Sequence, residues 1–172
     1  SKILDLLENE YKGIVLSHKR ASSNAMENMP FDGVIQDVIA QKFGSEEIDA
    51  ILCLTVDAPF RSSVYIDKAI NSMRILNLDI VLGVVPDEGH FFQHDGTGLH
   101  PIGINPLVND LRFERDYIYR QVGGLMLIKY SHFISGHKLF DGKVGHIVLD
   151  EMASFSLSHK IDLKIADQKL GN

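Results

Sequence analysis

The 172-residue sequence is poor in several features that mark particular classes of protein. It has one cysteine, Cys53, so no disulfide can form within the chain, and its place inside an apolar run favours a buried thiol over a nucleophile. No apolar run approaches the roughly 20 residues that span a bilayer, and no secretory signal follows Lys2. We therefore expect a cytoplasmic protein with no membrane partner.

Basic residues are also scarce, because 17 Lys and Arg stand against 23 Asp and Glu, which gives a net charge of −6. A general nucleic-acid binder needs a basic face to neutralise phosphates, so we expect no nucleic-acid partner. The chain lacks a Gly-rich phosphate loop and a dinucleotide fingerprint. It also lacks a G-x-S-x-G nucleophile elbow, which leaves serine-hydrolase chemistry without support.

What is present is an ordinary globular composition, with 45% apolar and 23% charged residues over a length suited to a single domain, residues 1–172. Helical and strand-like apolar patterns alternate along it. The predicted helices are Ile3–Tyr11, Phe31–Phe43, Val64–Leu76, Ser131–Ser135 and Ile161–Leu170, and the predicted strands are Ile14–Leu16, Ala50–Thr55, Asp79–Val85, Gly123–Lys129 and Val144–Leu149. This order predicts an α/β fold with three layers (α/β/α) and a mostly parallel sheet. Because the chain opens on a helix, we expect its first βα unit to be missing.

The segment 88–116 interrupts this alternation. Phe91–His94 and Leu99–Ile102 are predicted to form a hairpin that projects from the sheet. Three histidines and Asp95 in this region suggest a metal site, but residues four apart on a strand are separated by about 13 Å. We favour a polar excursion that faces a partner, and its two adjacent phenylalanines make it a candidate dimer contact.

Asp57 and Arg61 are the first candidate catalytic residues. The run Ala50–Thr55 is typical of a strand buried on both faces, and ligands of open α/β sheets bind beyond the carboxyl ends of such strands. A carboxylate for the metal and a guanidinium for the oxygens suit a magnesium-bound phosphate. The alternative is an ordinary polar loop before a helix, in which Arg61 pairs with Asp57 or Asp67.

Three longer blocks carry a family resemblance. They are an Arg-led polar loop in Lys19–Ile39, a Pro-x-Arg core followed by a helix in Leu54–Ile70, and a Tyr-Arg-x-x-Gly pattern in Tyr119–Lys129. Together with the closing IDLKIAD at 161–167, these blocks resemble the cytidylyltransferases that activate acidic sugars, the CMP-sialic acid synthetase group. The resemblance implies a nucleotide-diphospho-sugar transferase-like fold, a homodimer, CTP and a 2-keto sugar acid as substrates, and Mg²⁺ as cofactor.

The resemblance also assigns roles to individual residues. Asp57 would carry the metal, and Arg61 would orient a phosphate or the sugar carboxylate. Arg20 would hold the nucleotide, with Asn24 contacting its base or ribose, and Thr55 replaces a glutamine of the family. The remaining substrate-binding residues that it implies are Arg120, Gln121 and Gly123, on the sugar side of the site.

Two departures from the family pattern leave the activity open. The family's opening loop, which grips the CTP phosphates, has no counterpart before Ser1, and its metal-binding Asp-x-Asp pair is replaced by Ser156 and Ser158. Hydroxyls are poor substitutes for carboxylates around Mg²⁺. Because of the matching blocks, we nevertheless favour a cytidylyltransferase that transfers CMP from CTP to a sialic acid-like 2-keto sugar acid and releases pyrophosphate. A catalytically degenerate relative that serves as a binding or assembly module is the alternative, and a glycosyltransferase or a piece of a longer enzyme also stays open.

Overall fold

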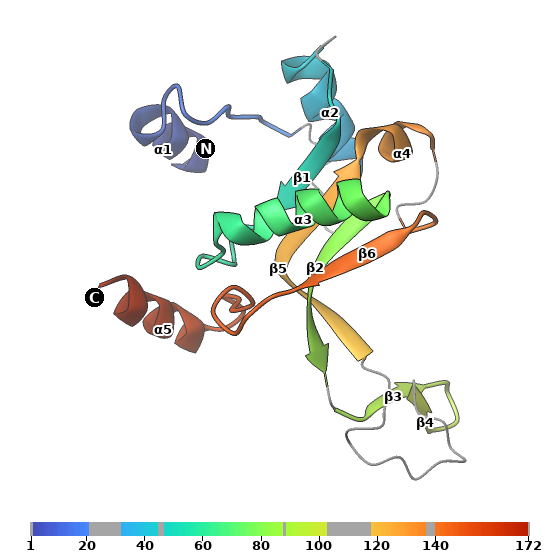
Figure 1. Cartoon of the computed structure of the whole chain (residues 1–172). Helices are drawn as coiled ribbons and strands as arrows, with labels where there is room; N and C mark the ends of the chain where they lie inside the picture. The colour runs from blue at the N-terminus through green and yellow to red at the C-terminus, as the bar shows by residue number, and fades with distance from the viewer. Residues whose placement is uncertain are drawn as a thin grey trace. The chain divides into compact units, whose positions relative to one another are not determined.

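The computed structural model describes residues 2–20, 32–44, 47–87, 89–102, 118–136 and 140–171. The chain forms two compact units, Ser1–Glu47 and Ile48–Asn172. The described helices of the N-terminal unit are α1 (Lys2–Glu10) and α2 (Asp32–Lys42), as predicted (Figure 1). Within this unit, the ring of His18 lies 2.9 Å from a carboxylate oxygen of Asp37 on α2.

The predicted strand at Ile14–Leu16 is wrong. Helix α1 ends in a turn, in which the Tyr11 carbonyl accepts hydrogen bonds from the N–H groups of Ile14 (3.0 Å) and Val15 (3.1 Å). Gly13 adopts a left-handed conformation (φ +79°), which allows the helix to end here. A run of three apolar residues does not discriminate between a strand and a helix end, and Ile14 remains 80% exposed.

The C-terminal unit contains the remaining predicted elements with small shifts at their ends. Its helices are α3 (Ser63–Leu76), α4 (Tyr130–Ile134) and α5 (Lys160–Leu170), and its strands are β1 (Ala50–Leu54), β2 (Ile80–Asp87), β3 (Phe91–His94), β4 (Leu99–Ile102), β5 (Ile118–Lys129) and β6 (Val144–Val148). The largest difference is β5, which begins five residues before the predicted strand at Gly123–Lys129.

The main sheet has the strand order β1-β5-β2-β6. Strand β5 is antiparallel to both of its neighbours, whereas β2 and β6 are parallel. Strands β1, β2 and β6 therefore run in one direction and β5 in the other. The α/β class is confirmed, and the sheet is mixed because of this one reversed strand.

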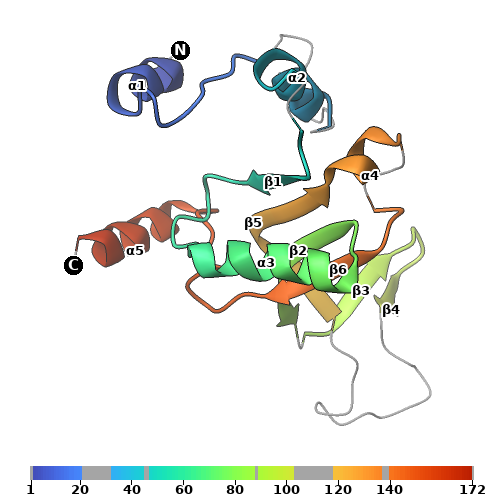
Figure 2. The same ribbon diagram turned by 45° about the horizontal axis from the view of Figure 1, so that its top comes forward.

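Helix α3 lies along one face of this sheet and contacts β2, β5 and β6 (Figures 1 and 2). Tyr65, Ala69 and Met73 follow one another at intervals of four residues, which places them on a single helix face. All three are buried in one core cluster that also contains Val81 and Leu125 from the sheet. The Ser62 side chain accepts a hydrogen bond from the N–H of Val64 (3.2 Å), so it caps the helix at the end next to the candidate site.

Burial differs between β1 and β2. Ile80 and Val81 of β2 are fully buried. Residues Ala50–Leu54 of β1, which the sequence predicts to be buried on both faces, are half-buried or exposed. Among the described strands β1 has one neighbour, β5, so only one of its edges is covered.

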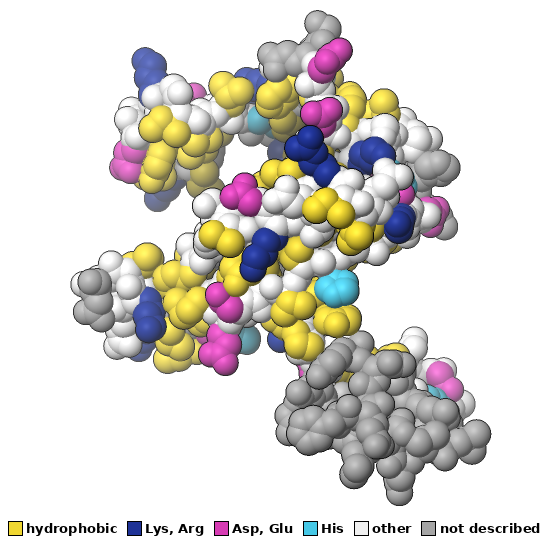
Figure 3. All heavy atoms as spheres, viewed as in Figure 1, with side chains coloured by type: hydrophobic (Ala, Val, Ile, Leu, Met, Phe, Trp, Pro, Cys, Tyr) yellow, Lys and Arg dark blue, Asp and Glu magenta, His cyan; other side chains and the backbone are white. Residues whose placement is uncertain are grey.

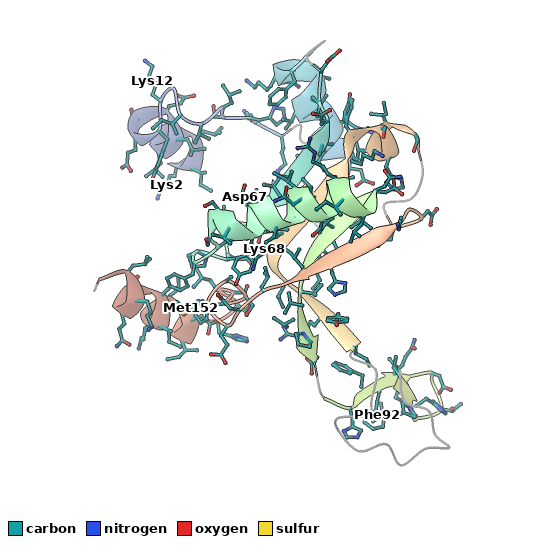
Figure 4. All side chains as sticks on the ribbon, in the orientation of Figure 1. Lys2, Lys12, Asp67, Lys68, Phe92 and Met152 are labelled. Carbon is teal, nitrogen blue, oxygen red and sulfur yellow. The ribbon has the colours of Figure 1, made fainter. Side chains whose placement is uncertain are left out.

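The hairpin forms at the predicted positions as a separate two-stranded sheet of β3 and β4. Asp95 stabilises its turn by accepting hydrogen bonds from the N–H (2.8 Å) and hydroxyl (2.7 Å) of Thr97, and its other oxygen lies 2.9 Å from the His100 ring. Phe92 projects from β3 and is 53% exposed (Figure 4). The dimer contact that we predict here stays a prediction.

Two surface features complete the description. Helix α5 exposes several apolar side chains, including Ile161 (58%) and Leu163 (51%), and apolar atoms are interspersed with charged ones over this helix (Figure 3). Among the described residues, no helix combines the length and apolar character needed to cross a membrane.

Candidate functional site

Asp57 lies in the loop that follows β1, where the sequence predicts a ligand site. One oxygen of its carboxylate, Oδ2, accepts a hydrogen bond from the Ser156 hydroxyl (2.9 Å). Its backbone carbonyl accepts another from the N–H of Leu157 (2.8 Å). The fold therefore brings the predicted metal carboxylate directly against one of the two serines that replace the family's aspartate pair, 99 residues further along the chain.

The environment of Asp57 favours its ionised form. The nearby hydroxyls of Thr55 and Ser156 lower the pKa of this carboxyl, with Thr55 the larger influence, and burial opposes them only in part. The second oxygen, Oδ1, is buried and has no hydrogen-bond partner among the described residues. A buried acceptor without a donor is costly, so this atom is suited to receive a ligand.

Ser158 has a different position from Ser156. Its N–H donates to Asp162 Oδ2 (2.9 Å), which also accepts from the N–H of His159 (2.6 Å). Asp162 thereby caps the first turn of α5. Of the two serines that replace the family's aspartate pair, Ser156 contacts Asp57, and no contact between Ser158 and Asp57 is seen among the described residues.

A bulge in β5 lies beside Thr55. Leu82 pairs with Met126 and Val84 pairs with Gln121, so the single residue Gly83 stands opposite four residues of β5. Two of these four, Gly123 and Gly124, are both left-handed (φ +64° and +49°). A Cβ on Gly124 would lie 1.7 Å from the Thr55 hydroxyl oxygen, which no real structure allows. The close approach of the β5 backbone to Thr55 therefore requires a glycine at position 124.

Arg61 connects this bulge to the loop after β1. Its Nε donates to the Gly123 carbonyl (2.8 Å), and its Nη2 donates to the same carbonyl and to the Thr55 carbonyl (3.3 Å). Partial burial lowers the pKa of the guanidinium and the Asp57 charge opposes this, but an arginine remains charged at any physiological pH.

The loop between β6 and α5 is fastened to the beginning of α3. Tyr65 donates its hydroxyl proton to Asp150 Oδ2 (2.8 Å), and the Asp150 N–H donates back to the Tyr65 oxygen (3.2 Å). Further along, the rings of Phe60 and Phe155 pack with centroids 5.7 Å apart. Three successive contacts, at Asp57, Phe60 and Tyr65, therefore hold this loop.

These contacts also shift two pKa values. Hydrogen bonds from the Ala153 N–H (2.7 Å) and then from the Tyr65 hydroxyl lower the pKa of Asp150. The bond to Asp150 raises the pKa of Tyr65.

Lys68 lies over the Tyr65 ring at 5.1 Å, and Figure 4 shows Lys68 projecting from α3 and Met152 from the loop. Tyr65 and Asp150 are not among the predicted site residues, although an acidic residue directly after a predicted strand is a signal that points to Asp150.

The other predicted substrate-binding residues are Arg120, Gln121, Arg20 and Asn24. Arg120 and Gln121 lie on the exposed first half of β5, where the Arg120 guanidinium is 3.3 Å from a carboxylate oxygen of Asp87. Arg20 belongs to the N-terminal unit and is exposed. Asn24 lies outside the described residues.

A scan against family models and a search of curated proteins found no match. Among solved structures, the chain is similar to the crystal structure of 4-diphosphocytidyl-2C-methyl-D-erythritol synthase from Anaerococcus prevotii DSM 20548. The TM-score is 0.60 at 14% sequence identity, and the match covers 99% of this chain and 76% of the other. At this identity the likeness shows the fold alone. The chain shares the α/β fold of that synthase, which agrees with the predicted fold class, and the likeness does not single out the acidic-sugar group.

Proposed function

We propose that this chain is a nucleotidyltransferase that takes CTP and transfers CMP to a 2-keto sugar acid, with pyrophosphate as the leaving group. The observation that carries the proposal is Asp57, an ionised carboxylate beyond the end of β1 with one buried oxygen that lacks a partner. Its position matches the ligand-binding edge of open α/β sheets. The name of the similar solved structure contains a diphosphocytidyl group, which favours a cytidine nucleotide over other nucleotides.

In the proposed reaction a sugar hydroxyl oxygen forms a bond to the α-phosphorus of CTP. The bond from that phosphorus to the oxygen of the β-phosphate breaks, and the hydroxyl proton is released. Negative charge builds on the phosphate oxygens, so catalysis depends mainly on positioning and on cationic stabilisation. The chain contributes Asp57 at the nucleotide side, and Arg120 with Gln121 at the sugar side. A sugar carboxylate would compete with Asp87 for the Arg120 guanidinium.

The residues present fit a magnesium ion in one respect. Mg²⁺ in nucleotide sites is often held by one or two carboxylates, with water and substrate phosphates completing its shell. Asp57 supplies one carboxylate with a free acceptor, Oδ1, whereas Ser156 donates its proton to Oδ2. When bound, the ion would neutralise charge on the nucleotide phosphates.

A second candidate is a binding or assembly module that has kept the fold without the chemistry. The hydrogen bond from Ser156 to Asp57 favours this candidate, because a family metal carboxylate would stand where a proton donor stands here. Such a module would bind CTP with little influence of Mg²⁺ and would turn over no acceptor.

The first test is a calorimetric titration of CTP into the 172-residue chain, with and without Mg²⁺, and with GTP as the control. We expect CTP dissociation constants on the order of micromolar, tightened by Mg²⁺, and no comparable binding of GTP. A panel of 2-keto sugar acids, with polyols related to methylerythritol as the competing class, is then assayed for pyrophosphate release. Failure of both nucleotides to bind would overturn the proposal. Binding of CTP with no turnover of any acceptor would favour the binding module.

A further inference from the structure

We propose that Arg61 is a positioning residue, which holds the double-glycine bulge of β5 against Thr55, and that it is not a ligand of the substrate phosphates. This assignment differs from the role that the family resemblance implies. Its ligand-binding test rests on the proposed function, whereas its structural test needs no ligand.

The Arg61 guanidinium already donates hydrogen bonds to backbone carbonyls. Nε and Nη2 form one of the two edges with which an arginine grips an oxyanion, and both donate to the carbonyl of Gly123. Nη2 also reaches the carbonyl of Thr55 at 3.3 Å. A phosphate that took this edge would leave the partly buried Gly123 carbonyl without its arginine donors, which is unfavourable.

The bulge of β5 depends on hydrogen bonds from outside the strand pairing with β2. Gly123 and Gly124 are consecutive left-handed residues, and they lie where the pairing of β5 with β2 is interrupted. The Gly124 carbonyl accepts from the N–H of Thr55 (3.1 Å), and the Gly123 carbonyl accepts from Arg61. These two bonds tie the bulge to the loop that bears Asp57. Arg61 therefore acts on the site through the backbone, by determining where Thr55 and Asp57 stand.

Substitutions of Arg61 can distinguish a positioning role from a phosphate-binding role, because arginine and lysine share a charge but differ in shape. Only a planar fork can donate to both carbonyls in this geometry, and a lysine offers a point charge on a flexible stem. Arg61→Lys keeps the charge and loses the fork, whereas Arg61→Gln loses both. Gly124→Ala breaks the same arrangement from the opposite side, because its Cβ would collide with Thr55. Arg74→Gln, in the exposed last turn of α3, is the matched control.

The ligand-free arm compares amide chemical shifts and hydrogen exchange of these variants. We expect Arg61→Lys and Arg61→Gln to shift the amides of Thr55, Gly123 and Gly124 and to increase their exchange, in the same pattern as Gly124→Ala. Arg74→Gln leaves them unchanged. Should Arg61→Gln fail to fold, Arg61→Lys carries this arm. Unmoved bulge amides in the Lys variant overturn the proposal, whether or not the wild-type chain binds CTP.

The ligand arm measures CTP affinity across a range of salt concentrations. We expect Arg61→Lys and Arg61→Gln to weaken CTP binding alike, by about tenfold, with the salt dependence of binding unchanged. If Arg61 instead contacted the substrate phosphates, Arg61→Lys would retain most of the CTP affinity, and Arg61→Gln would flatten its salt dependence. That result would overturn the proposal. If the wild-type chain binds no CTP, the proposed function fails and the ligand-free arm alone decides the role of Arg61.

Discussion

The two halves of β5 differ in how they are held. Residues Leu125–Lys129 pair with β1, and Met126–Ile128 also pair with β2 on the other side. Leu125 and Ile128 are fully buried. Residues 118–121 pair with β2 alone among the described strands, and Tyr119, Arg120 and Gln121 are exposed. The glycine bulge separates the halves. The inner half lies next to the Asp57 site, and the outer half carries the predicted sugar-binding residues.

This difference determines what each half can contribute to a site. At the inner end, the N–H of Thr55 donates to the Gly124 carbonyl and the N–H of Leu157 donates to the Asp57 carbonyl, so the position of Asp57 follows from the fold. At the outer end Arg120 is 60% exposed and meets one carboxylate, so its position depends on its own rotamer. Preorganised chemistry is therefore expected at the inner end, and adaptable recognition at the outer end.

The largest effect that separates the halves is expected from Leu125→Ala. Leu125 is 0% exposed in the main core, and removing such a side chain leaves a cavity that costs about 2–5 kcal/mol. Urea denaturation would measure this loss, with Gln121→Ala on the exposed half as the control. A loss below about 1 kcal/mol for Leu125→Ala would contradict the distinction between the halves.

The next effect concerns the carboxylate at the inner end. Ser156→Asp places a second carboxylate against Asp57 and removes a hydrogen bond, which we expect to destabilise the chain by about 1–2 kcal/mol at neutral pH. Millimolar Mg²⁺ should recover this loss, because two carboxylates share the ion. Thermal unfolding with and without Mg²⁺ measures both changes. Ser158→Asp is the matched control, and an equal Mg²⁺ response in that variant would refute a site at Asp57.

A smaller effect is expected where the loop after β6 is fastened to α3. Tyr65→Phe removes the hydroxyl that Asp150 accepts from, and should lower the Tm by about 2–4 °C. Asp150 has a lowered pKa, so this stabilisation is present above the ordinary carboxyl pKa and is lost as pH falls through the lowered one. Tyr65 has a raised pKa, so it is also lost as pH rises through that value.

The double-mutant cycle of Tyr65→Phe and Asp150→Asn, measured by thermal unfolding across this pH range, checks the pair. The difference between wild type and Tyr65→Phe should close at acid pH. Additive single and double variants at neutral pH would show that the two groups are not coupled.

The sequence predicts the elements of this fold better than their relations. The turn residues locate the hairpin, and apolar periodicity locates the ends of α3 and α5 to within a residue or two, because these features depend on neighbours along the chain. It does not predict that β5 is reversed, since strand direction depends on how segments far apart in sequence connect. It overestimates the burial of β1 for the same reason, because burial of a strand depends on which strands flank it.

The same distinction applies to the candidate site, where local features are predictable and contacts between distant segments are not. The place of Asp57 in the loop after β1 follows from the predicted strand, whereas its role as a metal ligand stays a prediction. That Arg61 bonds to the Gly123 and Thr55 carbonyls is not predictable, since a sequence indicates that an arginine is present but not which acceptors a fold brings to it. The left-handed pair Gly123 and Gly124 is visible in sequence only as two glycines, whose collision-free fit against Thr55 requires the structure.

The smallest stability change is expected at the outer half of β5, and there the binding effect is the informative one. Arg120→Ala removes an exposed ion pair with Asp87, which is worth about 1 kcal/mol at most, so the urea midpoint should hardly move. If the guanidinium receives a sugar carboxylate, affinity for the acid acceptor should nevertheless fall, while CTP affinity stays as in the wild type. Asp87→Asn is the complementary variant, because it frees Arg120 from its partner and should tighten binding of the acid. If both variants bound the acid acceptor as tightly as the wild type does, Arg120 would not contact the acceptor.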